Sequence, residues 1–184
     1  MAIVFELWAE TRDEESLDAV AYHFSDLTFR LHTGATIRWQ ANRVGAPHYP
    51  PAVVVGTRDL SSSGVRSVKD ALECTEAGLH LYSHLKMAPA FTYARVDWDP
   101  ECVPLCELQD YLDHYPDGSC SLPLSCVLAD DVYRGLGSPK HFEPFRDGYV
   151  WHRYRGETYR PLYSNDQSDL NAICRELFPE YFRY

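Results

Sequence analysis

The sequence contains no apolar run of the roughly 18 residues or more that a membrane-spanning helix requires. Its opening stretch, MAIVFELWAE, lacks a basic segment and already includes Glu6, so we expect neither a secretory signal nor a membrane anchor. The pattern therefore predicts a cytoplasmic protein. Thiols stay reduced in that compartment, so the six cysteines are expected to be free.

Positive charge is missing from one long segment. Between Val96 and Tyr133 there are nine acidic residues and no lysine or arginine, whereas Arg134 to Arg160 has six basic residues against three acidic ones. The whole chain has a formal net charge of −10, which argues against a general affinity for polyanions such as nucleic acid or anionic membranes. The two segments either neutralise one another within the fold or leave an acidic surface for a partner.

Signatures of known chemistry are also scarce. The sequence has no Walker A motif, no G-x-G-x-x-G, no nucleophile elbow and no H-E-x-x-H. We therefore predict no cofactor, and the interpretation leans away from an enzyme. The enzyme hypothesis that remains is a small catalyst whose scattered histidines and acids meet between the two halves of the chain.

Aromatic side chains are abundant. Of 184 residues, 13 are Tyr and 4 are Trp, and 45% of the chain is hydrophobic. This length and composition are typical of one globular domain, or of a domain with an extension. Because tyrosine and tryptophan combine an apolar ring with a polar group, they favour half-buried and interface positions. We therefore expect a binding surface.

Residues 1–100 alternate between strand and helix patterns. A first strand is expected at Ile3–Ala9, followed by a helix that begins at a capping box formed by Thr11 and Glu14. Apolar residues then recur at helical spacing as far as Leu31, which predicts a helix over that stretch.

Two further strands, Ala35–Asn42 and Ala52–Thr57, precede a second helix that Ser67 caps, with Asp70 three residues later. A fourth strand is expected at Ala90–Asp97. The resulting order, β-α-β-β-α-β, is the ferredoxin-like pattern, so the predicted class is α+β.

Residues 101–184 are less regular and are predicted to form a mixed α/β extension that packs on the first part as one compact domain. A short helix is expected from Pro104, with Leu105, Leu108 and Leu112 on its apolar stripe, and a strand at Ser121–Ala129.

The end of the chain is predicted to contain a hairpin and a helix. Residues 134–148 are expected to form a loop, and residues 149–163 a β-hairpin that turns near Arg155-Gly156-Glu157. The last helix is capped by Ser164 and ends at Pro179.

Four of the six cysteines lie close together in sequence, at Cys102, Cys106, Cys120 and Cys126. Their spacing fits the close pairs of structural zinc sites poorly. Strand alternation places Cys120 and Cys126 on the same face as neighbouring leucines, so buried core thiols are the favoured interpretation. Carboxylates follow Cys106 one and two helical turns later and disfavour a thiolate. We predict neither a metal site nor a reactive thiol.

A pair of histidines, His80 and His84, stands one helical turn apart. By helical angle they share a face with Glu73 and Glu76, opposite the apolar stripe. This arrangement is more typical of a solvated polar face than of a pair of metal ligands.

The stretch RDLSSSGVRSVK leads from a strand into a helix N-terminus. Such places attract anions, because backbone N–H groups and the helix dipole point toward them. The candidate anion-binding residues are Arg58, Ser63, Gly64 and Arg66. An ordinary capped loop is the competing interpretation.

The predicted hairpin interleaves aromatic rings with arginines, the residue types that dominate interface hot spots. The candidate binding residues are Tyr149, Trp151, Arg153, Tyr154, Arg155, Tyr159 and Arg160. In the competing interpretation, the rings cover the core while the arginines pair with the acidic segment.

These observations predict a non-catalytic intracellular binding or regulatory protein that acts on a protein partner through the hairpin and the acidic surface. A small enzyme is one alternative, and a nucleotide or RNA binder is another. The strand at 52–57 lacks the aromatic pattern of RNA-binding sheets, so a nucleic-acid partner is not expected. A membrane partner is not expected either, and homo-oligomerisation is left open.

Overall fold

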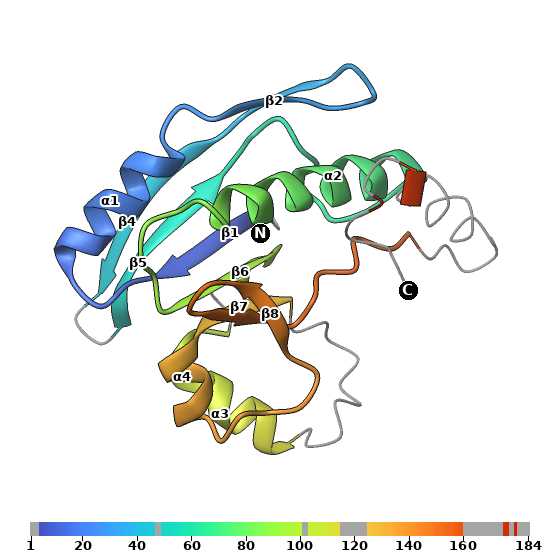
Figure 1. The fold of residues 1–184 in the computed structure, drawn as a ribbon. Coiled ribbons are helices and arrows are strands. Elements are labelled where there is room, and N and C mark those ends of the chain that lie inside the picture. The colour runs from blue at the N-terminus through green and yellow to red at the C-terminus, as the bar shows by residue number, and fades with distance from the viewer. Residues whose placement is uncertain are drawn as a thin grey trace.

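The structure is a computed structural model that describes residues 4–46, 49–100, 103–114, 125–159, 175–176 and 179. Helices cover both faces of a seven-stranded sheet, in which every pair of neighbouring strands is antiparallel (Figure 1). The class is α+β. Among the described residues, no helix has the length and apolar character needed to cross a membrane.

The strands run in the order β4-β5-β1-β6-β7-β9-β8. Their bounds are β1 Phe5–Glu10, β4 Gln40–Ala46, β5 Tyr49–Gly56, β6 Tyr93–Trp98, β7 Cys126–Ala129, β8 Glu143–Arg146 and β9 Tyr149–Trp151. A separate two-stranded sheet joins β2 (Thr28–Arg30) to β3 (Thr36–Arg38). The extension continues the main sheet, because β7 pairs with β6.

Side chains alternate between two faces of the sheet. Leu7 and Val55 enter a large core beneath α1 (Glu14–Phe24) and α2 (Val68–Leu85), on what we call the α1/α2 face. Trp8 enters a smaller core beneath α3 (Leu105–His114) and α4 (Asp130–Gly135), on the α3/α4 face. The apolar stripe predicted for α3 is confirmed, because Leu108 is fully buried in this second core.

The helix caps differ from the sequence prediction at one position. Asp13 caps α1, and its carboxylate accepts the backbone N–H of Ser16. The predicted cap, Thr11, is wrong, because its hydroxyl is buried against the carbonyl of Pro51. For α2 the prediction is confirmed, since the Ser67 hydroxyl accepts the N–H of Asp70.

The first helix is also shorter than predicted. It ends at Phe24, and Asp26 then adopts a positive φ of 59°, a left-handed conformation that stops a helix. The apolar pattern continues to Leu31 for another reason. Leu31 belongs to the connection within the β2–β3 hairpin, which buries it against the main core.

The strand predicted at Ala35–Asn42 is split at Trp39 into β3 and β4. The indole of Trp39 is buried, and its backbone N–H donates to the carbonyl of Leu27 instead of to a strand partner. The residues before the split pair back onto β2, around a turn at Gly34 with φ of 86°.

The hairpin predicted near Arg155-Gly156-Glu157 is wrong in position. The hairpin joins β8 to β9 and turns at Asp147-Gly148, where glycine takes a φ of 77°. The predicted loop at 134–148 therefore contains a strand. An aspartate-glycine pair is a strong turn signal, and the glycine at 156 instead lets the chain pass close to α2. The helix predicted at 164–179 lies almost entirely outside the described residues.

Candidate functional site

A pocket of about 680 Å³ opens at the end of the sheet where β5 leads into the loop at 57–62. Strand register builds its floor. Gln40, Gly56 and Glu6 stand opposite one another across β4, β5 and β1. Their neighbours Ala41, Val55 and Leu7 face the main core, so by alternation this row points to the α3/α4 face.

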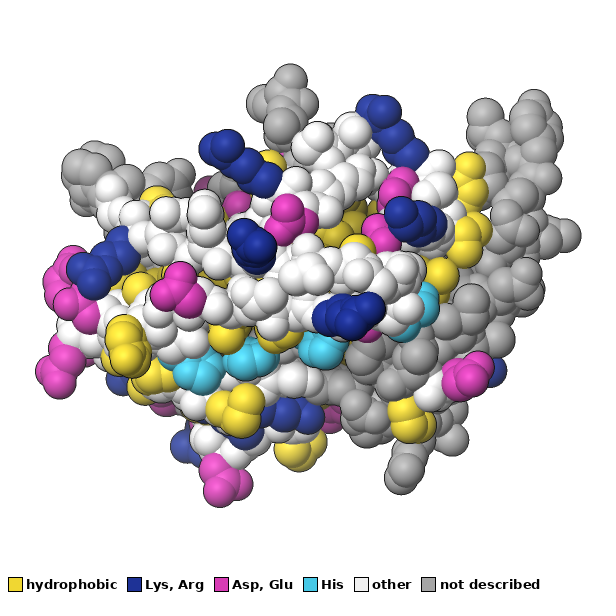
Figure 2. All heavy atoms as spheres, turned by 90° about the horizontal axis from the view of Figure 1, so that it is seen from above, with side chains coloured by type: hydrophobic (Ala, Val, Ile, Leu, Met, Phe, Trp, Pro, Cys, Tyr) yellow, Lys and Arg dark blue, Asp and Glu magenta, His cyan; other side chains and the backbone are white. Residues whose placement is uncertain are grey.

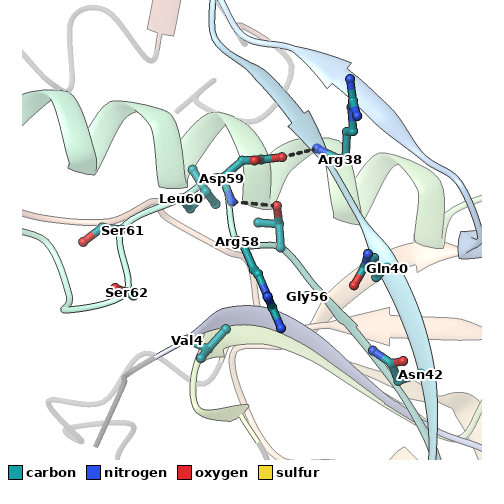
Figure 3. Close-up of a pocket in the computed structure, with 11 residues that line it drawn as sticks. Val4, Arg38, Gln40, Asn42, Gly56, Arg58, Asp59, Leu60, Ser61 and Ser62 are labelled. Atoms are coloured by element: carbon teal, nitrogen blue, oxygen red, sulfur yellow. Dashed lines mark hydrogen bonds between the residues drawn. The ribbon is translucent and has the colours of Figure 1, made fainter.

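Arg58 is one of two arginines that line the pocket, together with Arg38. Figure 3 shows the Arg58 side chain extending from the loop past Gly56 toward Val4, with Gln40 and Asn42 on the side of β4 that faces it. The guanidinium of Arg58 forms no ion pair with any described residue. Its N–H donors, together with two side-chain amides, remain available to a ligand.

Two carboxylates lie near the pocket. Asp59 turns toward the backbone of Arg38 and accepts its N–H at 2.8 Å (Figure 3). A Cβ placed on Gly56 would stand 3.1 Å from Oε2 of Glu6, so that carboxylate lies against the floor. The site therefore offers acceptors as well as donors.

The loop holds itself in place with its own hydroxyls. The Thr57 hydroxyl accepts the N–H of Asp59 at 3.1 Å, and the Ser61 hydroxyl donates to the carbonyl of Gly64 at 2.7 Å. A loop fixed in this way loses little entropy when a ligand binds.

The structure divides the predicted anion site. Arg58 lines the pocket, but Ser63, Gly64 and Arg66 are not among its described lining residues. At the N-terminus of α2, the Ser67 hydroxyl accepts the N–H of Asp70, and the Asp70 carboxylate accepts the N–H of Arg66. Two of the N–H groups around this helix end are therefore already bonded to the protein's own side chains.

No protein-family model matches the chain, and comparison with curated proteins and with solved structures gave no significant match.

The predicted Arg/aromatic surface is largely internal. Trp151 is 4% exposed and Tyr154 is 3% exposed, and both rings pack against Tyr82 in the main core. Arg153 pairs with Glu143.

Tyr149 has a structural role as well, because its hydroxyl donates to the carbonyl of Phe91 and accepts the N–H of the same residue. Arg155 is exposed and Tyr159 is partly exposed, while Arg160 lies outside the described residues. The contact surface predicted from sequence thus shrinks to Arg155 and Tyr159.

A partly buried carboxyl group that the sequence did not single out contacts these rings. Glu157 accepts hydrogen bonds from the Trp98 indole at 2.8 Å and from the Tyr154 hydroxyl at 2.9 Å. Burial raises the pKa of Glu157 to about 7, and the negative charge of Asp97 adds to the effect. Because both donors belong to core rings, we assign Glu157 a structural role.

The polar face predicted for α2 is not solvated, and that interpretation is wrong. Glu76 is 6% exposed, because the β2–β3 hairpin lies over it. His80 is stacked against Phe29 of β2, with ring centroids 4.6 Å apart. The sequence could not show this, since no pattern in it indicated that a hairpin would follow α1.

Among the described residues no group of three or more His, Cys, Asp or Glu side chains could hold a metal ion. Cys126 is fully buried beside Leu128, as strand alternation predicted, whereas Cys106 is exposed. Cys102 and Cys120 lie outside the described residues.

The acidic and basic segments meet at one described ion pair, Arg134 with Asp130 at 3.6 Å. A second acid of the segment, Asp131, pairs instead with Arg12 from the start of the chain. The two blocks therefore do not neutralise one another as a unit within the described residues.

Proposed function

We propose that this chain is a non-catalytic binding protein that holds a small anionic ligand in the pocket between β4, β5 and the loop at 57–62. The observation that carries the proposal is the Arg58 guanidinium, which has no ion-pair partner among the described residues and faces the amides of Gln40 and Asn42. The pocket volume of about 680 Å³ suits a small molecule.

The ligand class follows from the groups that line the pocket. A guanidinium recognises carboxylate, sulfate or phosphate through paired N–H donors, and the amides add neutral donors beside it. Asp59 lines the pocket and supplies a carboxylate acceptor, which suits a hydroxyl or amine group on the rest of the ligand. A small anion that also carries hydroxyl or amine groups would therefore match both the donors and the acceptors of the pocket.

Binding is favoured over catalysis by the residue types present. The described lining contains no histidine, cysteine or lysine, the side chains that most often act as nucleophile or general base. The Ser61 hydroxyl is engaged with a backbone carbonyl and has no described base beside it.

The test is a titration with sodium sulfate at pH 7.5 and constant ionic strength, followed by calorimetry and by thermal shift. Because Arg58 is exposed, we expect an affinity in about the millimolar range. Arg58→Ala should weaken sulfate binding about fivefold to tenfold, which corresponds to the loss of one charged hydrogen-bonding group.

Arg66→Ala is the matched control, since Arg66 is also an exposed arginine of the same connection but does not line the pocket. It should leave sulfate affinity unchanged. Equal loss in both variants would indicate general charge attraction, and the absence of sulfate binding in the wild type would reject the proposal.

We also propose a ferredoxin-like arrangement for residues 4–100, with residues 101–184 joined to it in one domain. The strand order β4-β5-β1-β6, antiparallel throughout, supports it, with α1 and α2 on one face (Figure 1). The three strands that extend the same sheet support a single domain.

The hypothesis of a protein partner now depends on fewer contact residues. Arg155 and Tyr159 are its remaining described contact residues, and Glu107, Asp110 and Asp113 form an exposed acidic side of α3. Arg155→Ala is the informative variant, because Trp151→Ala would leave a cavity in the core and destabilise the fold. Loss of a specifically captured partner in Arg155→Ala would support the hypothesis, and unchanged capture would count against it.

A further inference from the structure

The β2–β3 hairpin connects the pocket to a group of histidines on the opposite face of the molecule. One end of the hairpin is at the pocket, where the backbone N–H of Arg38, the last residue of β3, donates to Asp59 of the pocket loop. The other end lies on α2, where the backbone N–H of His32 donates to both carboxylate oxygens of Glu76 at 3.0 and 3.1 Å.

Aromatic contacts hold the middle of the hairpin. The Phe29 ring is parallel to His80 within 16° and lies 5.2 Å from His84, measured between ring centroids. His84 in turn lies 5.9 Å from His23 of α1. Figure 2 shows histidine side chains gathered along this face, in cyan. The hairpin thus packs against the imidazoles of His80 and His84.

We propose that the β2–β3 hairpin is a pH-responsive latch that couples the histidines of α2 to the anion pocket. This inference rests on the pocket function proposed above. When the latch is closed, Arg38 holds the carboxylate of Asp59 and fixes the loop. When it opens, Asp59 loses this donor, and the loop that carries Arg58 is held only by its own Thr57 and Ser61 hydroxyls.

The charged groups around the two histidines come from α1, α2 and the hairpin. Burial lowers the pKa of His80, although the carboxylate of Glu76, 3.9 Å away, raises it in part. Burial also lowers the pKa of His84, and the positive charges of His23 and His80 lower it further. Glu76 is shared with His32 of the hairpin.

One turn closer to the N-terminus of α2, Lys69 lies 3.7 Å from Glu73, and Glu73 also accepts the hydroxyl of Thr33 from the hairpin. We assign the pH response to His80 and His84, the two histidines of α2 whose pKa values burial lowers.

The direction of the response follows from the lowered pKa values. A base whose pKa is lowered in the closed state stabilises that state above its ordinary pKa of 6.5, and the stabilisation is lost as pH falls below that value. Acid therefore favours the open hairpin, in which the imidazolium ions reach water. Ligand affinity should fall with the population of the closed state.

The experiment measures sulfate affinity at pH 5.5 and at pH 7.5 by calorimetry, at constant ionic strength. Sulfate is chosen because it stays doubly charged across this range. We expect binding to be about fivefold weaker or more at pH 5.5 in the wild type, a coupling at the lower end of the usual range. His80→Gln with His84→Gln should show nearly equal affinity at the two pH values.

His141→Gln is the matched control, because His141 is exposed and belongs to neither α2 nor the hairpin. It should keep the wild-type pH dependence. Asp59→Asn, which weakens the acceptor for Arg38, tests the coupling without touching a histidine and should also reduce the pH dependence.

The outcomes separate the two proposals. Equal sulfate affinity at both pH values in the wild type would overturn the latch while leaving the pocket assignment intact. Unchanged pH dependence in the double histidine variant would overturn it as well. No sulfate binding at either pH would overturn the pocket and the latch together. Hydrogen exchange across residues 28–38, corrected for intrinsic rates, should rise at pH 5.5 in the wild type, and its failure to rise would also overturn the latch.

Discussion

Replacing Glu157 with glutamine is expected to stabilise the protein, by an amount that grows as pH rises from about 4.5 to about 7. In the native state the carboxyl group is held between the Trp98 indole and the Tyr154 hydroxyl. Glutamine has nearly the same shape as the protonated acid. Its side-chain carbonyl oxygen can accept the indole N–H of Trp98. Its NH₂ group can donate to the Tyr154 hydroxyl, once that hydroxyl has turned its hydrogen away. The substitution therefore removes the negative charge without removing the contacts.

The magnitude follows from the pKa of Glu157, which burial raises from 4.5 to about 7. Between these values the folded protein keeps a proton that the unfolded chain has lost, so stability falls as pH rises and the loss is complete above pH 7. An interval of about 2.5 pH units, at about 1.4 kcal/mol per unit, gives about 3–4 kcal/mol. Glu157→Gln should recover up to that amount at pH 8.5 and almost none at pH 4.5.

Urea denaturation of both proteins at pH 4.5, 6.5 and 8.5 measures the difference in free energy of unfolding. Glu107→Gln is the matched control, because Glu107 is exposed on α3, and its effect should stay within about 0.5 kcal/mol at all three values. A difference between wild type and Glu157→Gln that does not grow from pH 4.5 to pH 8.5 would refute the reasoning.

Three other predictions concern the core. Gly78→Ala should destabilise by about 1–3 kcal/mol in denaturant unfolding, because a Cβ there would stand 2.8 Å from the Tyr154 ring. Gly135→Ala, with open space around its Cβ position, should be nearly neutral, and equal effects would contradict this packing. Glu10→Ala should lower the free energy of unfolding by about 2 kcal/mol and increase hydrogen exchange in α3. The reason is that the buried Glu10 carboxylate accepts the Leu105 N–H and the Trp8 indole N–H. Unchanged protection of α3 would contradict this prediction. A thiol reagent at pH 8 should modify Cys106 in the folded protein but reach Cys126 only after unfolding, because burial raises the pKa of the Cys126 thiol to about 12. Mass spectrometry showing rapid labelling of Cys126 in the folded state would contradict its placement.

Local signals predicted parts of both the first 100 residues and the extension. The Ser67 cap in the first part and the burial of Cys126 in the extension both follow from spacing rules that depend on a few neighbouring residues. The end of α1 was misplaced because Leu31 fits a helical stripe although it is buried by a hairpin. The spacing of apolar residues indicates which of them are buried, but it does not show whether a helix or a hairpin buries them.

The candidate site was predicted only in part. Arg58 was recognisable from its loop, but Gln40 and Asn42 become pocket residues only through the register of β4 against β5. Register depends on contacts between residues far apart in sequence, which a single sequence does not reveal. The aromatic segment was assigned to the surface because composition alone does not distinguish a core tyrosine such as Tyr154 from an interface one.

The most direct test of the pocket is a crystal structure of the protein soaked in selenate, an anion close to sulfate in shape and charge, with data collected at the selenium edge. We expect an anomalous peak within hydrogen-bonding distance of the Arg58 guanidinium, on the side of Gln40 and Asn42. A peak at Arg66 or Arg155 with none at Arg58 would contradict it.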